Sequence, residues 1–151
     1  MKIVKSIEIK KDPKEVFDYL KITKNQDNFS VWNMADPDMT KNYQGTDGSV
    51  GFIYRWDSKI KNVGAGEIEI SNIKDGKEID YTLRFLRPME NTGTTEFVVD
   101  PLKDNTALVT WKFEAPSKFP YSLLSPVFKR MMGKDLSRGL SNLKGILEKP
   151  S

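Results

Sequence analysis

One feature of the sequence constrains the fold more than any other: a series of short alternating segments in its middle. Between Lys41 and Ala115, runs of alternating apolar and polar residues are separated by stretches rich in Gly, Asp and Asn. Alternation with period two is typical of strands with one buried face, and such turn residues join neighbouring strands as antiparallel hairpins. With a similar run at residues 3–11, we predict a seven-stranded antiparallel sheet, the later strands lying at 41–44, 50–57, 65–73, 78–86, 94–101 and 107–115.

Helical patterns flank these strands. Asp12-Pro13 begins a short helix with an apolar stripe, and a second short helical piece is expected within residues 25–37. After Pro120, apolar residues recur every three or four positions, which predicts one long helix. Gly133 and Gly139 lie inside it, so the helix either packs closely there or bends. The apolar positions of this helix are Phe128, Met132, Leu136, Leu140, Leu143 and Leu147.

The predicted sheet buries an aromatic face that is wide for one helix. A helix with its side chains is about 10–12 Å across, whereas seven strands spaced about 4.8 Å apart span about 30 Å. We therefore expect the sheet to curl around the long helix and to leave a cavity between them. The alternative is that the aromatic side chains interdigitate and fill this space.

Two absences exclude much chemistry. The chain contains no Cys and no His, which excludes disulfides, thiolate and imidazole metal sites, a Cys nucleophile and a Ser-His-Asp triad. We expect no metal and no cofactor, and any catalysis would fall to carboxylates, Lys, Arg, Tyr, Ser or Thr. With 151 residues and no linker, we expect a single domain over residues 1–151.

Charge is mild overall but uneven. The net charge is +3, too low to indicate a nucleic-acid-binding protein. Residues 118–151 carry an excess of positive charge, for which we expect a solvated helix face, with anionic lipid or RNA as alternatives. Neither a signal peptide nor a membrane span is expected, since no apolar run is long enough. A cytoplasmic protein without stable membrane insertion is the default expectation.

Three sets of residues resemble functional groups, but the sequence context favours a structural role for each. Glu67 and Glu69 share a strand face, which we assign to solvent unless the register is reversed. Arg84 and Arg87 are expected in surface salt bridges, with a ligand carboxylate at a cavity mouth as the alternative. The segment GTDGSVG (residues 45–51) lacks the context of a phosphate-binding loop and is interpreted as a hairpin loop.

The chain resembles the SRPBCC, or START-like, superfamily over essentially its whole length. SIEIKKDPKEVFDYL (residues 6–20) is similar to the opening of that superfamily. Four further segments are similar to its polyketide cyclase/dehydrase and lipid-transport branch, and MGKDLSRGLSNLKGILE (residues 132–148) resembles the branch's C-terminal helix. The resemblance implies the α+β helix-grip fold, in which a curved sheet wraps a long C-terminal helix. The four segments are YQGTDGSVGFIYRWDS, GAGEIEISNI, GTTEFVVDP and TALVTWKFEAP.

Members of this superfamily bind lipids, sterols, plant hormones or polyketides between sheet and helix, and only some are enzymes. The resemblance therefore implies a small hydrophobic ligand of lipid, polyketide or aromatic type. Two alternatives stay open: a cyclase or dehydratase using Tyr, Arg or carboxylate groups, and a cochaperone-like module that binds a protein partner. Aromatic walls with few polar groups suit such a site, and the candidate ligand-binding residues are Trp32, Tyr54, Trp56, Tyr81, Leu83, Phe85, Phe97, Trp111, Phe113, Phe128, Met132 and Leu136.

Overall fold

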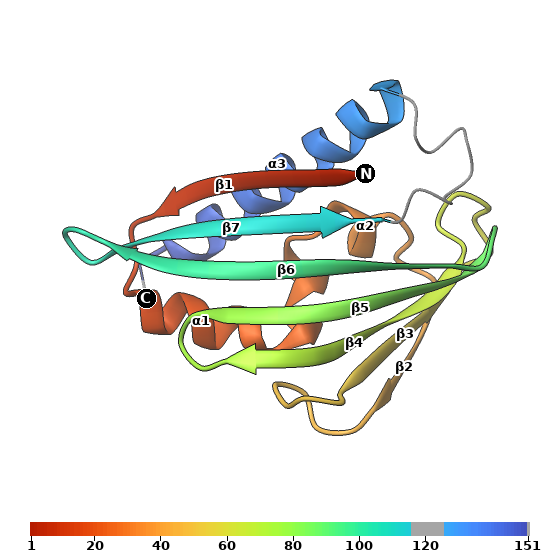
Figure 1. Ribbon diagram of the computed structural model, residues 1–151, viewed down its shortest axis with the longest axis horizontal. Coiled ribbons are helices and arrows are strands. Elements are labelled where there is room, and N and C mark those ends of the chain that lie inside the picture. The colour runs from red at the N-terminus through yellow and green to blue at the C-terminus, as the bar shows by residue number, and fades with distance from the viewer. Residues whose placement is uncertain (116–125, 151) are drawn as a thin grey trace.

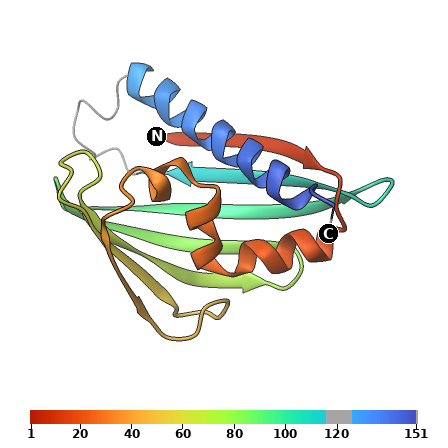
Figure 2. The same ribbon diagram turned by 180° about the vertical axis from the view of Figure 1, so that it is seen from behind.

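The computed structural model describes residues 1–115 and 126–150, and it shows one curved antiparallel sheet with helices on one face (Figures 1 and 2). The strands are ordered β1-β7-β6-β5-β4-β3-β2. The hairpin pairing of neighbours from β2 to β7 was predicted, whereas the pairing of β1 with β7 was not. The elements in chain order are β1 (Lys2–Ile9), α1 (Pro13–Lys21), the 3-10 helix η1 (Thr23–Asn28), α2 (Val31–Met34), β2 (Thr40–Gln44), β3 (Ile53–Asp57), β4 (Ala65–Lys74), β5 (Glu78–Arg87), β6 (Asn91–Leu102), β7 (Thr106–Glu114) and α3 (Pro126–Leu147).

Strand alternation sets the two faces of the sheet as the sequence predicts. On β7, for example, Ala107, Val109, Trp111 and Phe113 are buried, while the residues between them are only partly buried. The paired register carries this alternation across the sheet, since Trp111 lies opposite Phe97 on β6 and Lys5 on β1. We call the helix-covered side the inner face and the other side the outer face.

Different helices cover different parts of the inner face. α3 runs along β1, whereas α1 packs on β5, β6 and β7 (Figure 2). The apolar stripe of α1 is fully buried there through Val16, Phe17 and Leu20. The sequence argument assigned this cover to the long helix alone. The structure corrects it, because the short first helix shields the middle of the sheet.

Close packing, and not a bend, explains the two glycines inside α3. A Cβ at Gly139 would lie 2.8 Å from the Trp111 ring, and one at Gly133 would lie 3.1 Å from Cε of Lys5. At Gly139 glycine lets the helix approach the sheet more closely than any other residue would, whereas at Gly133 the neighbour is the movable end of a lysine.

The hairpin loop between β2 and β3 differs in length from the prediction. Gly51 has a φ of +95°, a conformation that favours glycine, so β3 begins at Ile53 instead of Val50. The loop also anchors the helical layer, because the Asp47 carboxylate accepts hydrogen bonds from the backbone N–H groups of Thr23 (2.8 Å) and Lys24 (3.0 Å).

Contacts between early and late segments close the fold. β1 pairs with β7 over its whole length. Beyond β1, the backbone N–H of Lys10 donates to the Glu148 carboxylate at 2.7 Å, and Lys144 Nζ donates to the carbonyl oxygen of Glu8 at 2.7 Å. None of the helices described is long and apolar enough to cross a membrane.

Candidate functional site

The inner face has two ends that differ in cover. We call the end where α1 begins and the β6–β7 hairpin lies the closed end, and the end where α3 begins and the β5–β6 loop lies the open end (Figure 1). At the closed end, the apolar side chains of sheet and helices are fully buried, Ile9, Ile79 and Leu143 being 0% exposed. Aromatic side chains continue along the inner face from this end to the other.

An aromatic cluster fills the middle of the inner face. Phe97 and Trp111 stack with their ring centroids 4.7 Å apart, and Phe29, from the segment between η1 and α2, meets both edge-on at 6.0 and 5.9 Å. Tyr81 adds an edge-on contact to Phe97 at 6.3 Å. In this part of the interior the rings interdigitate, which is the second of the two outcomes considered for the sheet.

The open end has a looser arrangement. Trp56 of β3 and Phe85 of β5 meet edge-on at 5.9 Å, and both remain partly exposed. Their strands leave space for these rings because Gly66 lies between them on β4, where a Cβ would approach the Trp56 ring to 2.8 Å. Trp56 is fixed by a hydrogen bond from Nε1 to the carbonyl oxygen of Val63 at 3.2 Å.

Trp32 of α2 forms the helical side of the open end. It is partly exposed and makes edge-on contacts with Trp111 at 5.9 Å and with Phe113 at 6.2 Å. Its Nε1 donates to a carboxylate oxygen of Asp135 on α3 at 3.2 Å, which ties α2 to the long helix. Trp32, Trp56 and Phe85 therefore form a partly exposed aromatic rim, contributed by the helical layer and by two strands.

The predicted site residues whose side chains are described all belong to the inner layer, where some are partly exposed and others are buried. The aromatic rim holds three of them. The side chain of Phe128 lies outside the described residues. The other eight are buried in the core, and these are Tyr54, Tyr81, Leu83, Phe97, Trp111, Phe113, Met132 and Leu136.

Buried polar atoms lie beneath η1, and sequence reasoning missed them. Thr23 Oγ1, Gln26 Nε2 and Ser30 Oγ are buried without a well-formed hydrogen bond among the described residues. The hydroxyl of Tyr81 is close by and donates a long hydrogen bond of 3.4 Å to the carbonyl oxygen of Leu20. Burial raises the pKa of Tyr81, although Thr23 and Gln26 beside the phenol partly oppose the rise. Only the polar composition of residues 23–30 hints at this cluster in the sequence.

Tyr54 makes a strong polar contact in the interior. Its hydroxyl donates to Asp27 at 2.6 Å, and Asp27 also accepts from Lys41 Nζ at 3.1 Å and from Asn33 Nδ2 at 3.0 Å. Burial, together with this carboxylate, raises the pKa of Tyr54 well above its usual value. The phenol is therefore a neutral hydrogen-bond donor and not a base.

The charged residues weighed in the sequence lie on the outer face. Arg84 bridges Glu67 at 2.7 Å and Glu69 at 2.9 Å, and Arg55 adds a second contact to Glu67 at 3.2 Å. These bonds to Glu69 and Glu67 raise the pKa of Arg84. Arg87 pairs with Asp57 at the surface. The predicted register and surface pairs are thus confirmed, and the reversed register is excluded.

The described residues include one cluster of acidic side chains with metal-ligating spacing: Glu78, Asp80 and Glu96. A hydrogen bond with Asp80, followed by burial, raises the pKa of Glu78. Lys74 lies 3.8 Å from Glu78, and Lys112 lies 3.8 Å from Glu96, so the two lysines offset the negative charge of the cluster. This arrangement is a network of charges on the outer face, in which Asp80 Oδ1 is buried without a well-formed hydrogen bond among the described residues.

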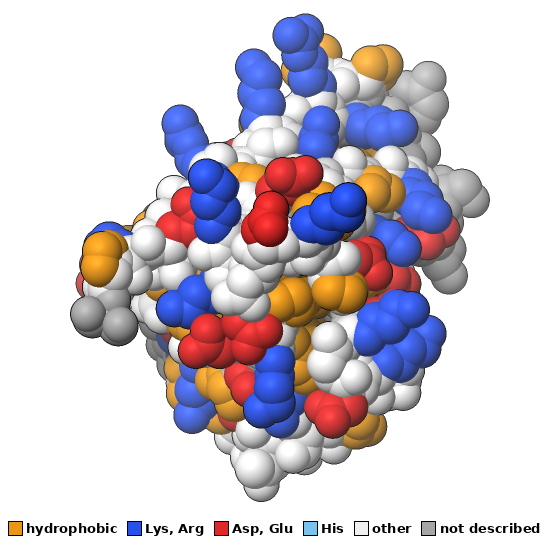
Figure 3. Space-filling model, turned by 90° about the vertical axis from the view of Figure 1, so that its left-hand side faces the viewer, with side chains coloured by type: hydrophobic (Ala, Val, Ile, Leu, Met, Phe, Trp, Pro, Cys, Tyr) orange, Lys and Arg blue, Asp and Glu red, His pale blue; other side chains and the backbone are white. Residues whose placement is uncertain are grey.

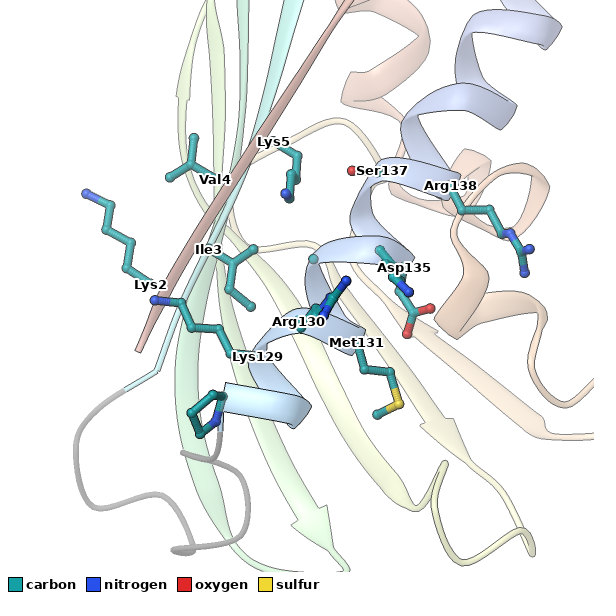
Figure 4. A pocket seen from close by; sticks show the side chains of 13 residues that line it. Lys2, Ile3, Val4, Lys5, Lys129, Arg130, Met131, Asp135, Ser137 and Arg138 are labelled. Atoms are coloured by element: carbon teal, nitrogen blue, oxygen red, sulfur yellow. The ribbon is translucent and has the colours of Figure 1, made fainter.

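Two open hollows lie outside the aromatic interior. One is a groove of about 960 Å³ between β1 and the first half of α3 (Figure 4). The other, of about 820 Å³, lies beside the β5–β6 loop and the end of β7, between Met89 and Ala115. Neither is lined by any of the predicted site residues whose side chains are described.

Comparisons with known proteins connect this geometry to a family. The model of the family described as polyketide cyclase/dehydrase and lipid transport matches residues 1–148. A search of curated proteins finds no match.

Solved structures show the same fold at low sequence identity. A START superfamily protein from Mycobacterium smegmatis has a TM-score of 0.63 at 14% identity, with 97% of each chain covered. Major latex-like protein 151 from Panax ginseng has a TM-score of 0.67 at 17% identity, covering 99% of this chain and 98% of that one. The Aha1 dimer from Colwellia psychrerythraea gives 0.66 at 14% identity, covering 98% and 96%. These similarities confirm the predicted helix-grip arrangement.

Proposed function

Since the chain belongs to the polyketide cyclase/dehydrase and lipid transport family, we propose that it binds a small hydrophobic molecule between the curved sheet and α3. The ligand is of lipid, polyketide or aromatic type, and it enters at the open end. The observation that carries this proposal is the aromatic rim of Trp32, Trp56 and Phe85, which is partly exposed although it belongs to the inner layer. Partly exposed aromatic side chains at the edge of an apolar interior offer area that a ligand can bury.

The buried polar atoms beneath η1 support the same proposal. An apolar site gains specificity from a few polar groups that can hydrogen-bond to a ligand. The side-chain atoms Thr23 Oγ1, Gln26 Nε2 and Ser30 Oγ, which have no well-formed hydrogen bond among the described residues, are candidates for this role. We propose that they receive a polar end of the ligand, while the rim holds its apolar body.

Ligand binding is tested first on the protein as purified. Native mass spectrometry before and after organic extraction detects a retained molecule, and titration with the neutral dye Nile red measures an apolar site. We expect saturable binding of the dye, competed by the extracted molecule. Incubation with that molecule then separates a carrier, which returns it unchanged, from a cyclase or dehydratase, which converts it.

Adjacent residues of β5 provide a matched pair of variants. Phe85 faces inward with the rim, whereas Leu86 is exposed. We expect Phe85→Ala to weaken dye binding by about tenfold, as the loss of an aromatic contact surface predicts, and Leu86→Ala by less than about twofold. Equal effects of the two substitutions, or no saturable binding by the unmodified protein, would refute the proposal.

A further inference from the structure

The groove between β1 and α3 has a strongly cationic surface. Six cationic side chains line it, against a single carboxylate, that of Asp135 (Figure 4). Figure 3 shows Lys and Arg side chains projecting from the upper end of the molecule, where Figure 1 places the start of α3. The six cations are Lys2, Lys5, Lys129, Arg130, Lys134 and Arg138.

The cations of the groove are gathered in one place and carry no ion-pair partner among the described residues, a lack they share with scattered surface lysines such as Lys77 and Lys103. Within the described part of the chain, none of the six forms a salt bridge, whereas Arg84 and Lys144 each hold a carboxylate at less than 3 Å. The one carboxylate of the groove, that of Asp135, already accepts the hydrogen bond from Trp32. The positive charge of the groove is therefore not neutralised by the described residues, and it attracts an anionic partner.

Apolar side chains accompany the charge. Val127 and Met131, on the first turns of α3, are 79% and 51% exposed, and Val4 on β1 is 46% exposed. Basic residues interleaved with exposed apolar ones fit the interface of an anionic bilayer, where cations meet the headgroups and apolar groups enter the acyl boundary. Nucleic acid fits less well, because no aromatic side chain among the described residues lines the groove for base stacking.

We propose that this basic groove docks the protein reversibly on the surface of an anionic phospholipid membrane. Lys129, Arg130 and Lys134 contact the headgroups, and Val127 and Met131 enter the interface. The groove lies at the start of α3, which Figure 1 places at the same end of the molecule as the open end of the inner face. Docking depends on the surface alone and does not require the interior ligand of the proposed function.

Vesicle flotation tests the docking. Full-length protein is mixed with vesicles of phosphatidylcholine alone or with added phosphatidylglycerol, at low and at physiological salt. We expect flotation with the anionic vesicles only, and weaker flotation as salt screens the charges. Equal flotation with neutral vesicles, or none with anionic ones, overturns the proposal.

Charge reversal locates the surface. We expect the double variant Lys129→Glu and Arg130→Glu to partition onto anionic vesicles about tenfold less or weaker still. Each cation near an anionic surface adds to the free energy of binding. The matched control, Lys77→Glu with Lys103→Glu, changes net charge equally at the closed end and is expected to stay within about twofold. Met131→Ser, which keeps the charge, is expected to reduce partitioning by about threefold.

Controls for folding and for nucleic-acid binding accompany the charge-reversal experiment. Circular dichroism melting establishes that each variant is folded, and Lys134→Gln with Arg138→Gln provides a milder pair if the reversal impairs folding. A control as weak as the groove variant indicates nonspecific attraction and overturns the proposal. Tighter binding to single-stranded RNA than to anionic vesicles, lost in the same groove variant, overturns it in favour of a nucleic-acid surface.

Discussion

The closed and open ends of the inner face are made from the same strands, yet only one of them is fully covered. At the closed end, Phe17 and Leu20 of α1 meet the sheet and are 0% exposed. At the open end, the aromatic rim of Trp32, Trp56 and Phe85 stays partly exposed. The strand pattern is the same at both ends, so the difference lies in where the helices are placed.

This difference separates residues whose whole surface is buried in the fold from residues that keep part of their surface exposed. A fully buried ring contributes its whole surface to folding, whereas a partly exposed ring keeps some surface available for binding. The two ends therefore respond differently to the same substitution.

The largest expected effect is the truncation of a ring at the closed end. Phe17→Ala removes a fully buried ring and is expected to lower the free energy of unfolding by about 3–5 kcal/mol. Phe85→Ala, at the open end, is expected to cost less, about 1–2 kcal/mol, because part of its ring is already exposed to water. Urea denaturation measures both, and similar losses would contradict the distinction between the ends.

Glycine-to-alanine substitutions in α3 compare tightly packed and open positions along a single helix. At Gly139 the new Cβ meets the Trp111 ring at 2.8 Å, and that ring is held in place by its stack on Phe97. Gly139→Ala is expected to destabilise the protein by about 1–2 kcal/mol after the gain in helix propensity.

Gly133 and Gly145 supply the controls for that substitution. At Gly133, the nearest atom is the flexible end of Lys5, so Gly133→Ala is expected to change stability by less than about 0.5 kcal/mol. At Gly145, nothing lies within 4 Å, so Gly145→Ala is expected to stabilise by up to about 1 kcal/mol. The ranking of the three variants is measured by thermal unfolding, and a destabilised Gly145→Ala would invalidate the comparison.

Tyr54 tests the polar tie between β3 and η1. Its raised pKa means that, above pH 10, the unfolded chain releases the phenolic proton while the folded chain keeps it. Stability is therefore expected to fall as pH rises above about 10, and Tyr54→Phe is expected to flatten that fall.

At neutral pH the same substitution is expected to cost about 1–2 kcal/mol for the lost hydrogen bond. Asp27 keeps Lys41 and Asn33 as partners, which limits the loss. Urea denaturation at pH 7 and pH 10.5 checks both statements, and an unchanged pH slope would show that Tyr54 ionises freely in the folded protein.

The smallest effect is expected on the outer face of the closed end. The pKa of Glu78 is raised by its hydrogen bond with Asp80 and by burial, so the folded state favours the protonated form and is stabilised at low pH. That stabilisation is lost as the pH rises through the raised pKa. Glu78→Gln is expected to add up to about 0.5 kcal/mol at pH 7 and nothing at pH 4.

Glu90, on the loop at the open end, serves as the comparison for Glu78. It lies at an exposed position outside the acidic cluster, so Glu90→Gln is expected to leave stability unchanged at both pH values. Thermal melts at pH 4 and pH 7 measure the stability of each variant relative to the unmodified protein. A gain at pH 4 as large as that at pH 7 would rule out charge repulsion as the cause.

Much of the fold was predictable because it depends on local pattern. Alternation placed Tyr81, Phe97 and Trp111 on one face, and the structure buries all three. The start of β3 was predicted too early, since the positive φ of Gly51 is a turn feature that apolar periodicity does not register.

The site was predictable only in part, because it depends on contacts between distant segments. Nothing in the spacing of residues pairs Tyr54 with Asp27 or Trp32 with Asp135. Likewise, the share of the sheet that α1 covers depends on the path of the chain after residue 21. The basic composition of the last segment was visible in the sequence, but its meeting with Lys2 and Lys5 across a groove was not.

The pairing of β1 with β7 has a consequence for how the molecule is assembled. β1 is made first, yet its partner strand is synthesised about a hundred residues later, as the Ser6–Thr110 hydroxyl contact illustrates. Until β7 has been synthesised, β1 has no partner strand in the sheet. Such distant pairing slows folding, and the sheet cannot be completed before that strand emerges.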